Sequence, residues 1–189
     1  MAGLKIITPP ATEPVTLADV KPQLRIDLDD DSYDGTLTPL IAVARDWCEG
    51  YQNRAYITQT LELAIDRWPC PPYDYIILPR PPLQSVVSIT YTDRDGNMMI
   101  WDPSNYIVND YWDPAQIVRA SGVCWPSVCL APTNGVKVRY VSGYGAAEDV
   151  PARIKQAIIL YVSEMFDSPG CPPSQAVKAL LDLDRVVPI

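Results

Sequence analysis

The sequence contains no histidine among its 189 residues. Histidine is the usual general base at neutral pH, the usual partner of a nucleophilic serine or cysteine, and the commonest ligand of catalytic zinc. Its absence removes the central group of most hydrolase mechanisms. We therefore expect a protein that is not an enzyme and that needs no cofactor or metal.

Cysteine is sparse, with five residues, an odd number, and no Cys-x-x-Cys pair. A disulfide framework or a zinc site normally shows paired spacings, which this chain lacks. We expect free thiols in a reducing compartment, although the sequence alone leaves open whether any of them pair. The positions are Cys48, Cys70, Cys124, Cys129 and Cys171.

Long apolar runs are also missing. A membrane-spanning helix needs about 18 consecutive apolar residues, and no run in this chain approaches that length. The opening stretch, MAGLKIITPPATEP, lacks the charged start and apolar centre of a secretory signal. We expect a soluble chain, found first in the cytoplasm, that does not associate with membranes.

Positive charge is in the minority, with 15 Lys and Arg against 23 Asp and Glu and a net charge of −8. A protein that grips nucleic acid neutralises phosphates with Lys and Arg. The balance argues against a DNA-binding module. It is compatible with a protein that stands beside DNA and lets it pass without specific binding.

Helical periodicity marks both ends of the chain. Apolar residues recur every three or four positions in four segments, which are residues 16–26, 34–51, 150–166 and 174–184. The first opens with Thr16 and Asp19 in a capping spacing and is expected to bend at Pro22. Pro39 requires the second helix to begin at about residues 34–36, because a proline ring is tolerated only near a helix start.

Between the helical segments the period changes to two, which is typical of strands. Asp95 and Gly96 between two β-prone runs predict a hairpin. The expected fold class is α+β, a small bundle in which N-terminal and C-terminal helices pack together, with an antiparallel β-rich insertion between them. The strand-like runs are residues 57–66, 75–79, 85–93, 98–101, 105–110, 116–120 and 136–145.

Four parts of the chain follow from this pattern. They are an N-terminal helical part over residues 1–56, a β-rich lobe over 57–146, a bundle-completing helix over 147–168 and a C-terminal docking tail over 169–189. The third part contains AIILYV, Ala157 to Val162, without one charged side chain. Because this helix is apolar almost all round, it needs cover from two sides. We expect one cover from the 34–51 helix and the other from the β lobe or another subunit.

Two sets of acidic residues were tested for chemistry. Asp30, Ser32 and Asp34 fit the spacing of a calcium loop, but Ile41 stands where a bidentate glutamate is needed. Carboxylates for glycoside hydrolysis are available without a spacing that fixes a pair. A carboxylate-dependent hydrolase is therefore a third-ranked alternative. These carboxylates are Asp66, Asp93, Asp95, Asp102, Asp110 and Asp113.

Five phrases of the sequence, in order and spacing, resemble the head-tail connector (adaptor, or head-completion) proteins of tailed bacteriophages, prophages and gene transfer particles. Together they span nearly the whole chain. The phrases are PVTLADVKPQLRID, LIAVARDWCEGYQNRAYITQTLEL, LPRPPLQSVVSITYTDRDG, YVSGYG and VPARIKQAIILYVSEMF.

The resemblance implies a structural virion protein. Twelve copies are expected to form a ring beneath the portal protein, to extend the DNA channel and to support a stopper or tail-completion protein. The ring is expected at the head-tail interface of the virion, after a stay in the host cytoplasm where the free chain can be a monomer. The C-terminal tail is expected to reach towards the portal. Candidate residues for subunit or portal contacts are Ile159, Phe166, Val177, Leu180, Leu181 and Arg185.

A binding module from another class remains open as the main alternative. Trp101, Trp112 and Trp125 lie in the second half of the β-rich segment, and tryptophan faces stack on sugars as well as on core neighbours. The alternative is a carbohydrate-binding or other structural module of a tail or baseplate.

Overall fold

The computed structural model describes residues 2–187, and it confirms the expected α+β fold class. The chain divides into two units. The β unit comprises the stretch up to Pro9 together with Thr58–Gly143, and the helical unit comprises Pro10–Ile57 together with the stretch from Tyr144 onward. Residues 188 and 189, the end of the expected docking tail, lie outside the described residues.

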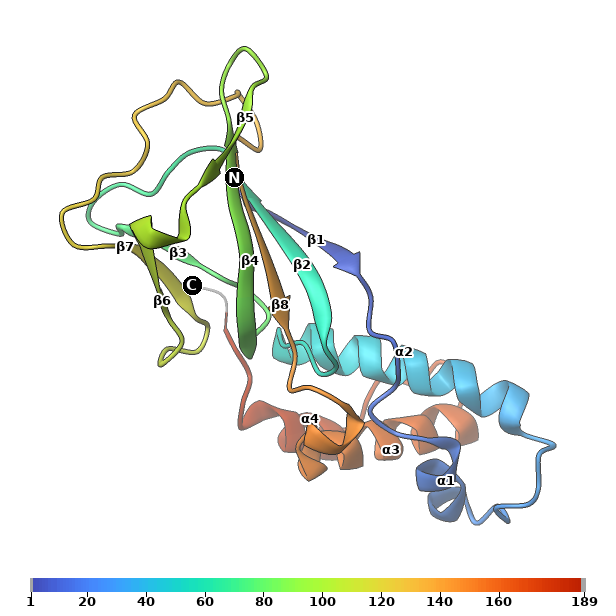
Figure 1. Cartoon of the computed structure of the whole chain (residues 1–189). Coiled ribbons are helices and arrows are strands. Elements are labelled where there is room, and N and C mark those ends of the chain that lie inside the picture. Colours follow the sequence, from blue (N-terminus) through green and yellow to red (C-terminus); the bar gives the residue numbers. More distant parts are fainter. Residues whose placement is uncertain (1, 188–189) are drawn as a thin grey trace. The chain divides into compact units, whose positions relative to one another are not determined.

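The helical unit contains four α-helices among the described residues (Figure 1). The expected start of the second helix is confirmed, because it begins at Asp34, although Pro39 then lies inside the helix and not in its first turn. The expected bend at Pro22 is a change from α-helix to a 3-10 turn over Lys21–Leu24. The helices are α1 (Leu17–Val20), α2 (Asp34–Gln52), α3 (Ala152–Asp167) and α4 (Gln175–Asp182).

The apolar middle of α3 is covered within the helical unit. Ala157, Ile158, Tyr161 and Val162 are buried, and Ile159 is half-buried against the same cluster. α3 packs on α2, as expected, and also on α4 and α1. The expectation that the second cover would be the β lobe or another subunit was therefore wrong. The reason is that α4 turns its own apolar side onto α3 instead of leaving it free.

The β unit consists of two antiparallel sheets (Figure 1). One has the order β1-β2-β8-β4-β5 and the other the order β3-β7-β6. The hairpin expected at Asp95 and Gly96 is confirmed as the turn between β4 and β5, where Gly96 has φ of 87° and glycine avoids strain. The strands are β1 (Ala2–Thr8), β2 (Gln59–Ile65), β3 (Tyr75–Ile77), β4 (Leu83–Thr92), β5 (Met98–Trp101), β6 (Tyr106–Asn109), β7 (Gln116–Arg119) and β8 (Val136–Ser142).

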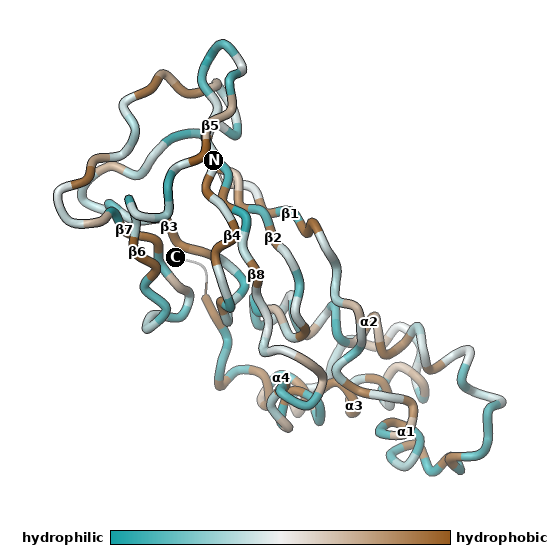
Figure 2. Tube along the Cα trace, in the orientation of Figure 1, coloured by the Kyte–Doolittle hydropathy of each residue, from teal (hydrophilic) through white to brown (hydrophobic). Residues whose placement is uncertain are grey.

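The core of the β unit lies between its two sheets. Leu61, Ile89 and Tyr140 come from the five-stranded sheet, while Ile76 and Ile117 come from the three-stranded sheet, and all five are 0–3% exposed. Alternation along each strand then directs the intervening residues of the five-stranded sheet to the opposite face. Figure 2 shows this mixture of polar and apolar residues along β2, β4 and β8.

Strand β1 differs from the sequence-based expectation. Residues 1–56 were expected to be a helical part of the bundle, but Ala2–Thr8 pairs with β2 as an edge strand of the β unit. Leu4 and Ile6 stand opposite Leu63 and Leu61, so the period of two was present but too short to be recognised. The hydrogen-bond partner that makes this segment a strand, β2, lies more than fifty residues away in the sequence.

Candidate interaction surfaces

Five of the six candidate interface residues come together in the helical core. Val177 and Leu181 are fully buried on α4, and Ile159, Phe166 and Leu180 pack against the same cluster with part of their surface exposed. The Phe166 ring meets the Tyr33 ring edge to face, with 5.6 Å between centroids. A docking role for Val177 and Leu181 therefore requires α4 to leave the bundle. It stays a prediction.

Arg185, the sixth candidate, belongs to a segment that is hydrogen-bonded along the C-terminal end of α2. The Gln52 side-chain amide donates to the Leu181 carbonyl at 2.6 Å, and the Val186 amide donates to the Gln52 carbonyl at 2.9 Å. Arg185 Nε donates to the Tyr51 carbonyl at 3.1 Å, and its guanidinium lies over the Tyr51 ring at 4.4 Å from the centroid. The chain is thus fixed to α2 as far as Val186.

A buried polar network at the same end of α2 was missed by the sequence analysis. Glu49, 1% exposed, accepts hydrogen bonds from Arg45 at 2.9 Å and from the Tyr56 amide at 2.7 Å. Arg45 also pairs with Glu13 at 2.7 Å. Burial opposes the charge of Arg45, but Glu49 and Glu13 together raise the pKa of its guanidinium. The four-residue spacing of Arg45 and Glu49 on a helix was the available signal.

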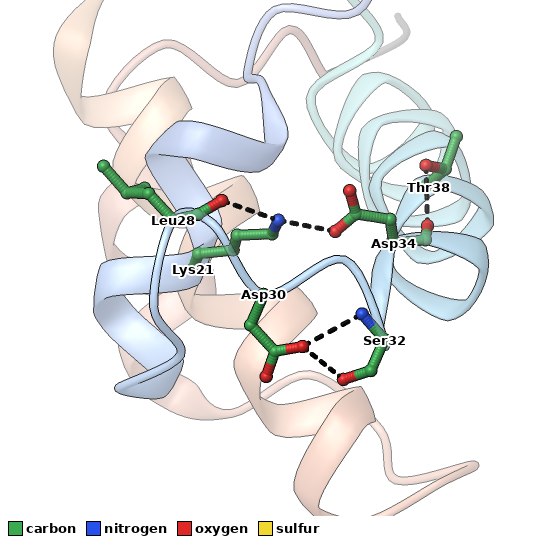
Figure 3. Close-up of polar contacts among 6 residues, drawn as sticks. All are labelled: Lys21, Leu28, Asp30, Ser32, Asp34 and Thr38. Carbon is green, nitrogen blue, oxygen red and sulfur yellow. Dashed lines mark hydrogen bonds and ion pairs between the residues drawn. The ribbon is translucent and has the colours of Figure 1, made fainter.

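The 3-10 turn is followed by an acidic loop, which we define as residues 27–34 and which ends at the first residue of α2. Figure 2 shows that this part of the chain is mostly hydrophilic. Figure 3 shows how Lys21, only 4% exposed, holds it: Nζ donates to the Leu28 carbonyl at 3.2 Å and pairs with Asp34 at 2.7 Å. The hydroxyl and amide of Ser32 both donate to Asp30, and these bonds lower the pKa of that carboxyl. The oxygens that resembled a calcium loop thus have protein partners.

The loop presents charge and one apolar side chain to solvent. Asp27, Asp29 and Asp31 are exposed, and Leu28 between them is 59% exposed. Because the Leu28 carbonyl accepts a hydrogen bond from the buried Lys21, the backbone of the loop is held at this point. Burying a lysine ammonium costs free energy unless it is paired. The pairing of Lys21 with Asp34 and the Leu28 carbonyl therefore indicates that this loop has a specific structure.

The face of the five-stranded sheet that points away from its core carries basic residues. The register places Lys5, Glu62 and Arg139 side by side across β1, β2 and β8. The next row places Lys137 between Ala64 and Thr90. Two shallow depressions, of about 310 and 210 Å³, meet at Glu62 and Lys137. We call this surface the basic groove, and it is defined by Lys5, Glu62, Asn134, Lys137, Arg139 and Met98.

Two of the carboxylates considered for glycoside chemistry, Asp93 and Asp102, serve turns. Asp93 accepts hydrogen bonds from the amides of Asp95 and Asn97, and Asp102 accepts them from Ser104. The side chains of Asn97 and Ser104 contribute most to lowering the pKa of Asp93 and Asp102. A general acid needs a raised pKa, so these shifts run in the opposite direction.

The three tryptophans of the alternative function lie in different surroundings. Trp101 is 5% exposed and packs on Trp125, with ring centroids 4.9 Å apart, while Trp125 also stacks on Trp68 at 5.0 Å. Trp112, in contrast, is 64% exposed. The faces of Trp101 and Trp125 are therefore used for packing, and the three rings do not form one sugar-binding platform.

The five cysteines are free thiols, as expected. Within the described part of the chain, no three His, Cys, Asp or Glu side chains come together as a metal site. None of the helices in residues 2–187 combines the length and apolar character needed to cross a membrane.

Comparison with known proteins gives a partial match to one family model and a likeness in fold to solved structures. The model of the phage gp6-like head-tail connector protein family matches residues 14–96. A comparison with the curated proteins gives no match.

Three solved structures that resemble this chain come from gene transfer agent (GTA) particles. A chain in the neck of an empty GTA particle, computed with C6 symmetry, has a TM-score of 0.81 at 19% identity, covering 99% of this chain and 97% of that chain. A chain in the virion of a native GTA particle gives 0.80 at 20% identity, covering 98% and 96%. A chain in the neck of the native particle, computed with C12 symmetry, gives 0.73 at 20% identity, covering 99% and 97%.

At these identities the structural likeness is one of fold. The family match adds a likeness in sequence, and its range contains three of the five phrases that carried the resemblance. The match and the fold confirm the resemblance to the phage gp6-like head-tail connector proteins.

Proposed function

We propose that this protein is a structural head-tail connector that assembles as a ring at the head-tail interface of a phage-like particle. One observation carries the proposal. The connector family matches residues 14–96, and the fold matches a GTA neck chain over 99% of this chain and 97% of that one. Near-complete coverage in both directions means that no large catalytic domain accompanies the common fold in the described residues.

The proposed ring has twelve copies, in keeping with the C12 symmetry used for the native GTA neck. A closed ring joins two different patches of the same chain, head to tail. The acidic loop and the basic groove are two such different patches. The net charge of −8 supports a channel that DNA traverses without specific binding, because phosphates are not attracted to a net acidic surface.

The proposed partners are the portal protein on one side and a stopper or tail-completion protein on the other. We propose a role without catalysis. Two observations support this. The chain has no histidine, and the pKa values of Asp93 and Asp102 are lowered, so these carboxyls are not suited to act as general acids near neutral pH.

Electron microscopy of the protein mixed with portal rings tests the proposal. We expect an added annulus on one face of the portal, and native mass spectrometry should count twelve added chains. A failure to associate with portal rings, together with binding to a polysaccharide array, would overturn the proposal in favour of the carbohydrate-binding alternative.

A further inference from the structure

The basic groove has an excess of positive charge that the chain itself does not neutralise. Arg139 pairs with Glu62 at 2.7 Å. Among residues 2–187, neither Lys5 nor Lys137 has a carboxylate within ion-pair distance, and both are exposed. In a chain with a net charge of −8, an unneutralised basic surface favours an acidic partner.

The groove also has room and an apolar border. Small side chains flank Lys137 across the register, with Ala64 on β2 and Thr90 on β4. Met98 and Ile100 on the neighbouring β5 are 71% and 70% exposed. The surface thus offers two ammonium groups beside exposed apolar side chains.

The acidic loop has the complementary composition. It carries the exposed carboxylates of Asp27, Asp29 and Asp31 around the exposed side chain of Leu28. The buried Lys21 fixes the loop by its bond to the Leu28 carbonyl, so little conformational entropy is lost when the loop binds.

We propose that the acidic loop of one copy docks in the basic groove of the next copy. The carboxylates of Asp27, Asp29 and Asp31 then pair with Lys5 and Lys137, and Leu28 lies against Met98 and Ile100. The two patches differ, so the contact is head to tail and repeats from copy to copy until a ring closes. The inference rests on the proposed function, because it names the contact that joins the copies of the proposed ring.

A second copy fits the groove better than DNA does. A protein that grips DNA through roughly six to ten phosphates needs about that many Lys or Arg contacts, whereas the groove offers three cations and one carboxylate. DNA would also leave Met98 and Ile100 without an apolar partner. DNA binding by the groove is the competing possibility, and the DNA affinity of the wild-type chain and of Lys137→Glu tests it.

The direct test is carbodiimide cross-linking, which joins a carboxylate to a neighbouring amine as an amide. Unlabelled and 15N-labelled full-length chains are mixed and cross-linked, both at high concentration and assembled on portal rings. We expect mixed-isotope peptides joining Lys5 or Lys137 to Asp27, Asp29 or Asp31. If these pairs occur only within one isotope, or do not occur in either preparation, the proposal is overturned.

Charge reversal provides the second test. Lys137→Glu and Asp29→Lys should each weaken association between copies at least about tenfold, and the double variant should regain most of the loss. Arg94→Glu and Asp46→Lys make the same charge changes at exposed positions outside both patches, and they should leave association unchanged. A double variant no better than either single variant contradicts the pairing.

Two outcomes separate this inference from the proposed function. If Lys137→Glu still forms normal rings on the portal, the groove is not the contact and the connector proposal stands. If the wild-type chain does not associate with portal rings, the connector proposal fails by itself. DNA affinity of the wild-type chain that Lys137→Glu abolishes would assign the groove to DNA and overturn the inference.

Discussion

The helical unit and the β unit treat their apolar and polar surface differently. In the helical unit the apolar sides of α2, α3 and α4 meet in one cluster, and the buried Glu49 has Arg45 and the Tyr56 amide as partners. In the β unit, among residues 2–187, apolar side chains are exposed on one face of the larger sheet, with Ile100 70% exposed there and Tyr111 98% exposed elsewhere in the unit. The comparison indicates that the helical core mainly supplies stability, and that the sheet face is available for association.

The largest effect is expected where a charge enters the helical core. Leu181→Asp buries a carboxylate at a fully enclosed position and should destabilise the helical unit by more than about 5 kcal/mol. Leu180→Asp, at the half-buried neighbour, should leave the chain folded and weaken binding to portal rings. Circular dichroism at 222 nm during urea unfolding, followed by co-purification with portal, measures both. Equal loss of helix in the two variants would contradict the different placement of these residues.

A smaller loss is expected when the buried network is broken. Glu49→Ala leaves Arg45 with only Glu13 and leaves the Tyr56 amide without its acceptor. The free energy of unfolding should fall by about 3–5 kcal/mol. Glu62→Ala is the matched control, because it removes one partner of an ion pair on the exposed face of the β unit, and it should cost about 1 kcal/mol or less. Similar losses of unfolding free energy in both variants would mean that the buried Arg45–Glu49 pair is no more important for stability than the exposed Arg139–Glu62 pair.

Alkaline pH should weaken the helical unit. Burial raises the pKa of the Cys48 thiol from 9.0 to about 12 and also raises the pKa of Tyr56. Because the folded-state pKa lies above the unfolded one, the stability is complete below pH 9 and is lost as the pH rises towards 12. Each such group contributes a slope of about 1.4 kcal/mol per pH unit. Urea unfolding of wild type and Cys48→Ala across this range should give a shallower decline in the variant.

The burial of Cys48, on which the alkaline-pH prediction depends, can be checked at neutral pH by thiol labelling. Cys70, Cys124 and Cys129 are exposed and should react with iodoacetamide in the native protein, whereas Cys48 should react only after unfolding. Rapid native labelling of Cys48 would contradict its burial.

The smallest effect on stability is expected on the sheet face. Ile100→Ser changes a side chain that is 70% exposed, so the free energy of unfolding should change by no more than about 0.5 kcal/mol. The same substitution should weaken association between copies if Leu28 packs there. Thermal unfolding and sedimentation equilibrium separate the two effects. A large loss of stability would show that this face is part of the folded core.

Local patterns predicted the elements well where a signal is contained in a few neighbouring residues. The start of α2 near Asp34 follows from the position of Pro39, and the turn between β4 and β5 follows from Asp95 and Gly96. The pairing of β1 with β2 could not be predicted in this way. Its short alternation at Leu4 and Ile6 becomes meaningful only beside Leu61 and Leu63.

The candidate residues show the same division. The sequence identified Leu180, Leu181 and Val177 as one apolar side of a helix, which the structure bears out. Whether that side packs on α3 or on another molecule depends on where the chain returns after the Pro-rich joint. The sequence of the eight residues of α4 does not indicate which surface this helix packs against.

The sequence by itself determined the class of fold, the resemblance to connector proteins, the lack of a histidine-based active site and the acidic net charge, since each depends on composition or on local order. The tertiary structure decided that α4 covers α3, that Lys21 fixes the acidic loop and that Lys5, Lys137 and Arg139 share one face. The physical reason is that burial and charge proximity are set by contacts between residues far apart in the chain, and the free energy of those contacts exists only once the chain has folded.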